Sequence, residues 1–184
     1  MKNVMCFGDS NTYGYDPAGM RDGTAVRYAQ DVRWCGVAQR DLGEGWHVIE
    51  EGLNGRTTVR DDMCHLDTNL NGIRALPMLL EAHKPLDAIV IMLGTNDSKP
   101  QNWAKKEQYV PDLVELIQVY QKLESKPRVY VATSATVPQA LDGITDEVVT
   151  GEVVPLQKEA ARQTGCEVID VNQLTKGHAD WYCD

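Results

Sequence analysis

Long apolar segments are absent from this sequence. No run of apolar residues approaches the roughly 20 that a helix needs to cross a bilayer. The apolar start of the chain reaches Gly8 and Asp9 too early for a secretory signal peptide. We therefore expect a cytoplasmic protein that does not insert into a membrane.

Positive charge is also scarce. The sequence holds 18 Lys and Arg residues against 27 Asp and Glu residues, which gives a net charge of −9. This balance argues against nucleic acid or an anionic membrane surface as a partner. It is compatible with a small neutral substrate, and it leaves a homo-oligomer open.

Several sequence motifs are missing as well. The five cysteines are odd in number, widely spaced and form no CxxC pair, so we expect reduced thiols and neither a zinc site nor a redox motif. The chain has no P-loop, no GxGxxG and no GxSxG. We therefore expect no metal and no organic cofactor, and the α/β-hydrolase type of nucleophile turn is excluded.

The sequence does contain short apolar runs that alternate with helical patterns. The runs predict five strands, at Val4–Phe7, Val48–Glu51, Ala88–Leu93, Val129–Ala132 and Val168–Val171. Helical spacing predicts helices over 34–42, 76–82, 113–123 and 147–164, the last with a break near Pro155. This alternation predicts a doubly wound α/β domain. We expect one domain over residues 1–184: a three-layer sandwich around a five-stranded parallel sheet in flavodoxin-like order.

The least regular stretches are 15–31, 61–71, 98–110 and 136–146. All but the second directly follow a predicted strand or a motif at a strand end. Ligands of open parallel sheets bind beyond the carboxyl ends of the strands. These loops are therefore candidate walls of a substrate site.

Three polar blocks follow the first three predicted strands: GDSN at 8–11, GLNGRTT at 52–58 and GTND at 94–97. In a parallel sheet all three lie along one edge. Ser10 could attack an ester carbonyl, while the Ser10 and Gly55 N–H groups and the Asn96 amide could donate to the oxyanion that forms. Taken singly, each block also fits a helix cap or a tight turn. Their joint occurrence in this order favours the acyl-transfer interpretation.

These blocks resemble those of the GDSL/SGNH hydrolases, and the stretches RWCGVAQRDLG and VIEEGLNGRTT resemble bacterial arylesterase and acyltransferase members. The resemblance implies a serine esterase or acyl hydrolase with Ser10 as nucleophile. It also implies an oxyanion hole formed by Ser10, Gly55 and Asn96. Acyltransferase activity is a further possibility within the family.

The family's last block is Asp-x-x-His, and Asp184, the last residue of this sequence, matches its aspartate. We expect the natural chain to continue to a histidine three positions later and to a final helix covering the sheet. His178 and His65 are the alternative bases. An inactive ester- or carbohydrate-binding module on the same fold is the alternative function. Tyr13, Tyr15 and Trp103 are candidates for lining a small substrate pocket, or for packing as loop anchors.

Overall fold

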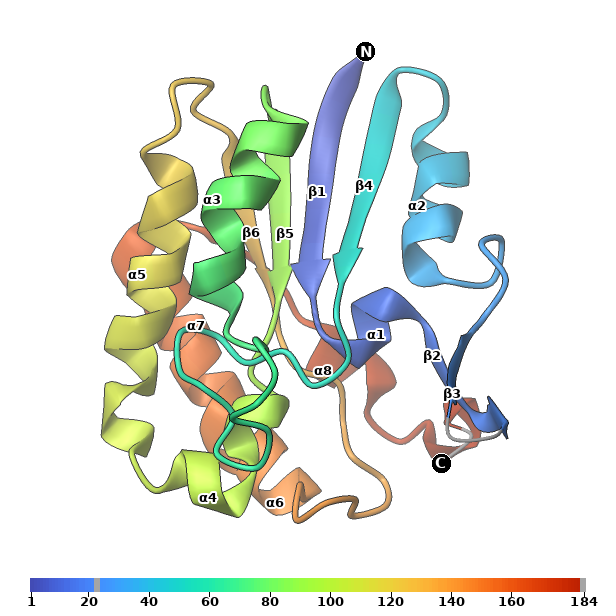
Figure 1. Cartoon of the computed structure of the whole chain (residues 1–184), viewed down its shortest axis with the longest axis vertical. Helices are drawn as coiled ribbons and strands as arrows, with labels where there is room; N and C mark the ends of the chain where they lie inside the picture. Colours follow the sequence, from blue (N-terminus) through green and yellow to red (C-terminus); the bar gives the residue numbers. More distant parts are fainter. Residues whose placement is uncertain (22–23, 183–184) are drawn as a thin grey trace.

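The computed structural model describes residues 1–21 and 24–182. Its centre is a parallel sheet of five strands in the order β4-β1-β5-β6-β7 (Figure 1). The strands are β1 (Lys2–Gly8), β4 (Trp46–Gly52), β5 (Ala88–Met92), β6 (Arg128–Ala132) and β7 (Glu167–Ile169). The predicted α/β class, the five parallel strands and their flavodoxin-like order are thus confirmed.

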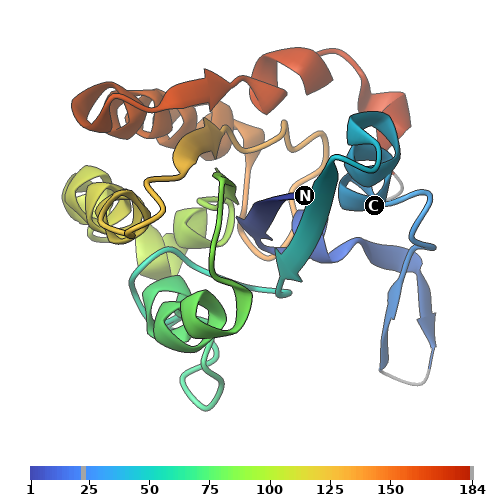
Figure 2. The same cartoon turned by 90° about the horizontal axis from the view of Figure 1, so that it is seen from above.

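Helices α3 (Gly72–His83), α5 (Tyr109–Gln121) and α7 (Val154–Thr164) cover one face of this sheet, and α2 (Trp34–Leu42) lies on the other (Figure 2). Alternate strand residues point to each face, so the core forms where the apolar positions of the strands meet the three helices. The main contributors to this core are Met5, Phe7, Ile89, Ile91, Val131, Leu76, Leu113, Leu116, Ile117, Ala160 and Ala161.

The α2 face is covered less completely over β5–β7. Val90, Met92, Ala132 and Ile169 line a cavity of about 500 Å³ there. Beyond β7 the chain continues through α8 (Val171–Thr175) and the 3-10 helix η4 (Ala179–Trp181). The fifth strand was predicted to run to Val171. It ends at Ile169, because the Asp170 side chain accepts from the Gln173 N–H and caps α8.

Residues 15–31 are more regular than we expected. They contain an antiparallel pair, β2 (Tyr15–Arg21) and β3 (Thr24–Arg27), which projects from the body of the molecule (Figure 2). The prediction of an irregular segment was wrong here. Pro and Gly within β2 interrupt the alternation of apolar and polar residues by which a strand is predicted from sequence. The pair directly follows α1 (Ser10–Tyr13), at the same sheet edge as Ser10.

The remaining helices are short. They are η1 (Asn96–Ser98), α4 (Pro100–Trp103), η2 (Lys106–Gln108) and α6 (Asp146–Val148). A π-helical turn, η3 (Val149–Val153), joins α6 to α7 just before Pro155. This is the break that Pro155 predicted, since proline cannot donate the backbone hydrogen bond of a helix interior. No helix within the described residues is both long and apolar enough to cross a membrane.

Two glycines allow the strand ends to approach α1. A Cβ on Gly52 would lie 2.0 Å from the Tyr13 nitrogen, and one on Gly8 would lie 2.1 Å from Thr12 Oγ1. The Gly52 contact is with backbone, which cannot rotate away. Close approach at these two positions therefore sets where Ser10, the first residue of α1, lies against the sheet.

We predict that Gly52→Ala lowers the free energy of unfolding by about 1–3 kcal/mol, the usual cost of overpacking. Urea denaturation measures it. The control is Gly45→Ala, where a Cβ would meet nothing within 4 Å, and which should change stability by no more than about 0.5 kcal/mol. Equal stability of the two variants would contradict this account of the α1 contact.

Candidate active site

Ser10 stands at the turn between β1 and α1. Asp9 caps the helix by accepting from the Asn11 N–H at 3.0 Å. Ser10 is therefore the first helical residue, and its own N–H has no partner inside the helix. Among the described residues, no hydrogen bond engages the Ser10 hydroxyl either. Both groups are thus available to a ligand.

Gly55 lies in the loop that follows β4, with a φ of +78°. The loop is held by the Leu53 N–H on the Gly8 carbonyl (3.1 Å) and by the Arg56 N–H on the Leu53 carbonyl (3.0 Å). In the part of the chain that the structure describes, the Gly55 N–H has no acceptor. The positive φ favours glycine, because other residues are strained there.

Asn96 begins η1, after the three residues that follow β5, and is 8% exposed. Its Nδ2 donates to the Arg56 carbonyl at 3.2 Å, and its backbone carbonyl accepts from Asn102 Nδ2 at 3.0 Å. An amide nitrogen carries two hydrogens, so one remains for another acceptor.

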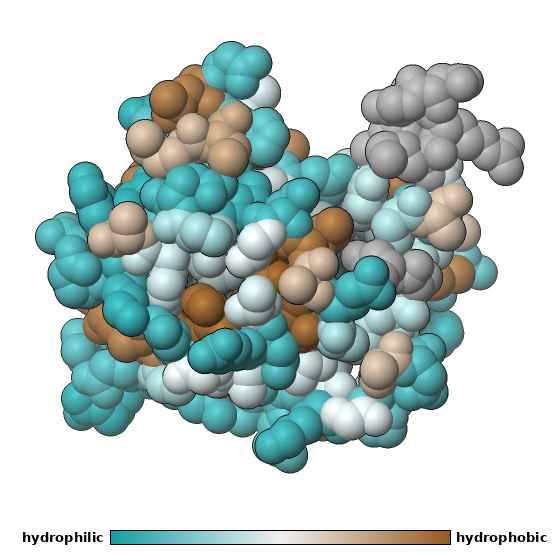
Figure 3. Space-filling model, turned by 90° about the horizontal axis from the view of Figure 1, so that it is seen from below, coloured by the Kyte–Doolittle hydropathy of each residue, from teal (hydrophilic) through white to brown (hydrophobic). Residues whose placement is uncertain are grey.

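One cavity of about 640 Å³ is lined by Ser10, Gly55, Asn96 and Tyr15. Seen from the end of the sheet where the strands terminate, apolar side chains gather in the middle of this face and polar ones surround them (Figure 3). The structure therefore brings four of the candidate residues to one place. Asp184 lies outside the described residues.

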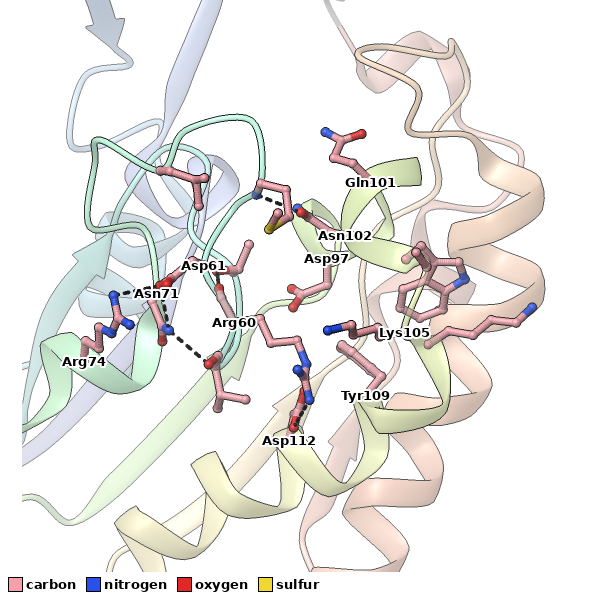
Figure 4. Close-up of a pocket in the computed structure, with 17 residues that line it drawn as sticks. Arg60, Asp61, Asn71, Arg74, Asp97, Gln101, Asn102, Lys105, Tyr109 and Asp112 are labelled. Atoms are coloured by element: carbon pink, nitrogen blue, oxygen red, sulfur yellow. Dashed lines mark hydrogen bonds and ion pairs between the residues drawn. The ribbon is translucent and has the colours of Figure 1, made fainter.

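Trp103 does not line this cavity. It borders a second one, of about 410 Å³, together with Asp97 and Tyr109 (Figure 4). Its Nε1 donates to Glu152 at 2.8 Å, and its ring meets Tyr109 edge-on at 5.4 Å. Trp103 packs as a loop anchor, the second of the two interpretations of the sequence. Tyr13 likewise stacks under the Arg27 guanidinium, 4.4 Å from the ring centroid.

Asp97 is a functional candidate that sequence reasoning left as a capping residue. Its buried carboxylate accepts from the Thr58 N–H at 3.1 Å and from the Thr58 hydroxyl at 2.7 Å. These bonds join the loop that carries Gly55 to the turn that carries Asn96. Burial raises the pKa of Asp97 to about 6; the Thr58 hydrogen bonds act against this rise, and the nearby Asp9 charge adds to it.

Arg56 was also missed, although it lies within the glycine block. It is 4% exposed, and its Nη1 donates to the Gly8 carbonyl at 3.0 Å and to the Glu51 carbonyl. Its guanidinium stacks on Phe7, 4.4 Å from the ring centroid. The side chain thus connects the loop after β4 to the ends of β1 and β4. An arginine next to glycines reads as surface charge in a sequence, so nothing signalled this role.

The four histidines differ in their positions. His65 lines the cavity of about 640 Å³ that Ser10 also lines, which we call the catalytic cavity for its candidate residues. His178 stacks on Trp181 at 3.8 Å, and His83 pairs with Glu51 at 2.8 Å. His47 is exposed near the start of β4. Within the described chain, His65 is thus the histidine that the structure places on the cavity wall.

The fold and the three ordered blocks place the chain among the SGNH-type hydrolases. It belongs to the GDSL-like lipase/acylhydrolase family, whose model matches residues 6–184. The chain is thus a member of a family of esterases and acyl hydrolases.

Individual relatives agree with this membership. The chain is 29% identical to an acetylxylan esterase of Xylanibacter ruminicola over 98% of its own length, although it spans 38% of that protein. It resembles Est24, a carbohydrate acetylesterase from Sinorhizobium meliloti, with 32% identity and a TM-score of 0.79 over 92% of this chain and 83% of that one. The aryl esterase of M. smegmatis is 36% identical, with a TM-score of 0.73 over 92% and 84% of the two chains.

The two buried acids beside the site predict a pH dependence of stability. Burial raises the pKa of Asp9 to about 6, as it does for Asp97, from an ordinary value of 3.8. At these two groups the folded protein then binds more protons than the unfolded chain between about pH 4 and pH 6, so their contribution to the free energy of unfolding falls as the pH rises through this window. We predict that Asp97→Asn removes its share of this contribution, so that the free energy of unfolding falls less, or rises more, with pH than in the wild type. Chemical denaturation at several pH values measures both slopes. Parallel slopes in the two proteins would show that Asp97 does not titrate there.

Proposed function

We propose that the protein is a serine esterase acting on small carboxylic esters. The observation that carries this proposal is that Ser10, Gly55 and Asn96 line one cavity, while the Ser10 hydroxyl and the Gly55 N–H have no partner among the described residues. A nucleophile and hydrogen-bond donors around one space are what acyl transfer requires. The carbohydrate acetylesterase and acetylxylan esterase among the relatives support a short acyl group.

In the proposed mechanism, a histidine takes the proton of the Ser10 hydroxyl as its oxygen attacks the ester carbonyl. The negative charge then forms on the carbonyl oxygen, where the N–H groups of Ser10 and Gly55 and the Asn96 amide donate to it. Collapse of this intermediate breaks the bond to the alcohol, which leaves with the proton from the histidine. Water repeats the sequence and releases the acid, whereas a second alcohol in place of water completes an acyl transfer.

Asp184 has the role of orienting the histidine and stabilising its charged form. This assignment comes from the resemblance of Asp184 to the aspartate of the family's Asp-x-x-His block. Tyr15 contacts the bound ester, since it lines the cavity with Ser10.

For the nucleophile, we predict that a fluorophosphonate probe labels the full-length protein and that Ser10→Ala abolishes both the labelling and the turnover of p-nitrophenyl acetate. The circular dichroism spectrum should not change, because Ser10 is partly exposed and its hydroxyl bonds to no described residue. Turnover that persists in Ser10→Ala would sink the mechanism. A folded wild-type protein that is neither labelled nor active would favour the binding module.

For the oxyanion hole, we predict that Asn96→Ala lowers kcat by roughly 10²–10³-fold, the usual effect of losing one such donor. KM should change less, because the charge develops mainly in the transition state. Steady-state kinetics separates the two. A raised KM with an unchanged kcat would make Asn96 a binding residue instead.

A further inference from the structure

The ring of His65 is held from behind by a buried acid. Its Nδ1 lies 3.2 Å from Oδ2 of Asp62, whose side chain is fully buried, while the His65 side chain is 55% exposed. His65 lines the catalytic cavity and Asp62 does not. The ring therefore stands between the carboxylate and the cavity that Ser10 also lines.

Asp62 is ionised whenever the protein is folded at ordinary pH. Burial alone would raise its pKa, but hydrogen bonds from Lys99 Nζ (2.6 Å) and the Cys64 N–H (2.9 Å) lower the pKa of Asp62 to about 2. An ionised carboxylate can only accept hydrogen bonds. When the His65 ring carries a single hydrogen, that hydrogen therefore sits on Nδ1, towards the carboxylate, and Nε2 is left as an acceptor. No residue of the described chain donates to Nε2.

The cavity surface at His65 carries an acceptor but little net charge. The charge of Lys99 is matched by Asp62, since both side chains are buried and in direct contact. The free acceptor is Nε2 of His65. Without an excess of positive charge beside it, this acceptor suits an uncharged donor, such as a hydroxyl group, better than an anion.

We propose that His65, positioned by Asp62, accepts a hydrogen bond from a free hydroxyl on the alcohol portion of the ester. The site then prefers esters of polyhydroxy alcohols, such as sugars, over esters of simple alcohols or phenols. This rests on the proposed function, because it places the alcohol portion of an ester beside Ser10. His65 is a specificity residue here and takes no part in moving the proton of Ser10.

The test compares two acetate esters of one sugar, the first with free neighbouring hydroxyls and the second with those hydroxyls O-methylated. We predict that His65→Phe raises KM for the first ester by about three- to tenfold, the effect of losing one hydrogen bond. Its kcat, and both constants for the methylated ester, should stay within about twofold of the wild-type values. His65→Gln should recover part of the loss, because its amide oxygen accepts. The matched control, His47→Gln, should behave as wild type on both esters.

Two outcomes overturn the proposal. An equal rise in KM for both esters would show that His65 only shapes the cavity. A fall in kcat of a hundredfold or more on both esters would make His65 the general base.

A parallel measurement keeps this test separate from the proposed function. Calorimetry on Ser10→Ala, with and without His65→Phe, compares the affinities for the two esters without any turnover. If the wild-type protein hydrolyses neither ester, the esterase proposal fails, but a hydroxyl-dependent affinity that is lost with His65 still supports its role. Affinities that do not depend on the hydroxyls refute that role whether or not the enzyme is active.

Discussion

The hydrogen bonds from Thr58 to the buried carboxylate of Asp97 hold the whole arrangement of the site together. They connect residues 39 positions apart and pin the loop after β4 to the turn after β5. The proposed oxyanion donors Gly55 and Asn96 lie on these two segments, so their spacing depends on this contact. A donor must lie within a few tenths of an ångström of its position to stabilise a developing charge, and a shared buried acceptor provides that accuracy.

At the same sheet edge, Arg56 donates hydrogen bonds to backbone carbonyls at the ends of the strands. Parallel strands that end side by side leave backbone carbonyls pointing into the protein, and each needs a donor. The Arg56 guanidinium supplies donors to the carbonyls of Gly8 and Glu51, at the ends of the two neighbouring strands. Its flat face packs on Phe7, which shields the charge from one side. One side chain thus stabilises the ends of both strands beside the site.

The sequence could predict what depends on local pattern. Buried strands such as 88–92 are continuous apolar runs, so the parallel sheet could be predicted. The glycine, serine and asparagine blocks follow strands, so the edge that carries Ser10, Gly55 and Asn96 could be predicted too. Contacts between distant segments could not. Neither the Asp97–Thr58 bonds nor the Asp62–His65 pair has a periodic signal. The bond from Trp103 to Glu152, 49 positions away, has none either. The β2–β3 pair was hidden because its first strand contains Pro and Gly.

The glycines and the serine of these motifs are required for different reasons. Gly8 and Gly52 are required by steric fit, whatever reaction the protein carries out. Ser10 has no comparable structural duty, because its hydroxyl bonds to no described residue. A descendant of this protein that had lost its chemistry could therefore replace the serine freely while keeping both glycines. In a survey of genomes, the glycines would then identify the architecture, whereas the residue between Asp9 and Asn11 would show whether the proposed nucleophile is present.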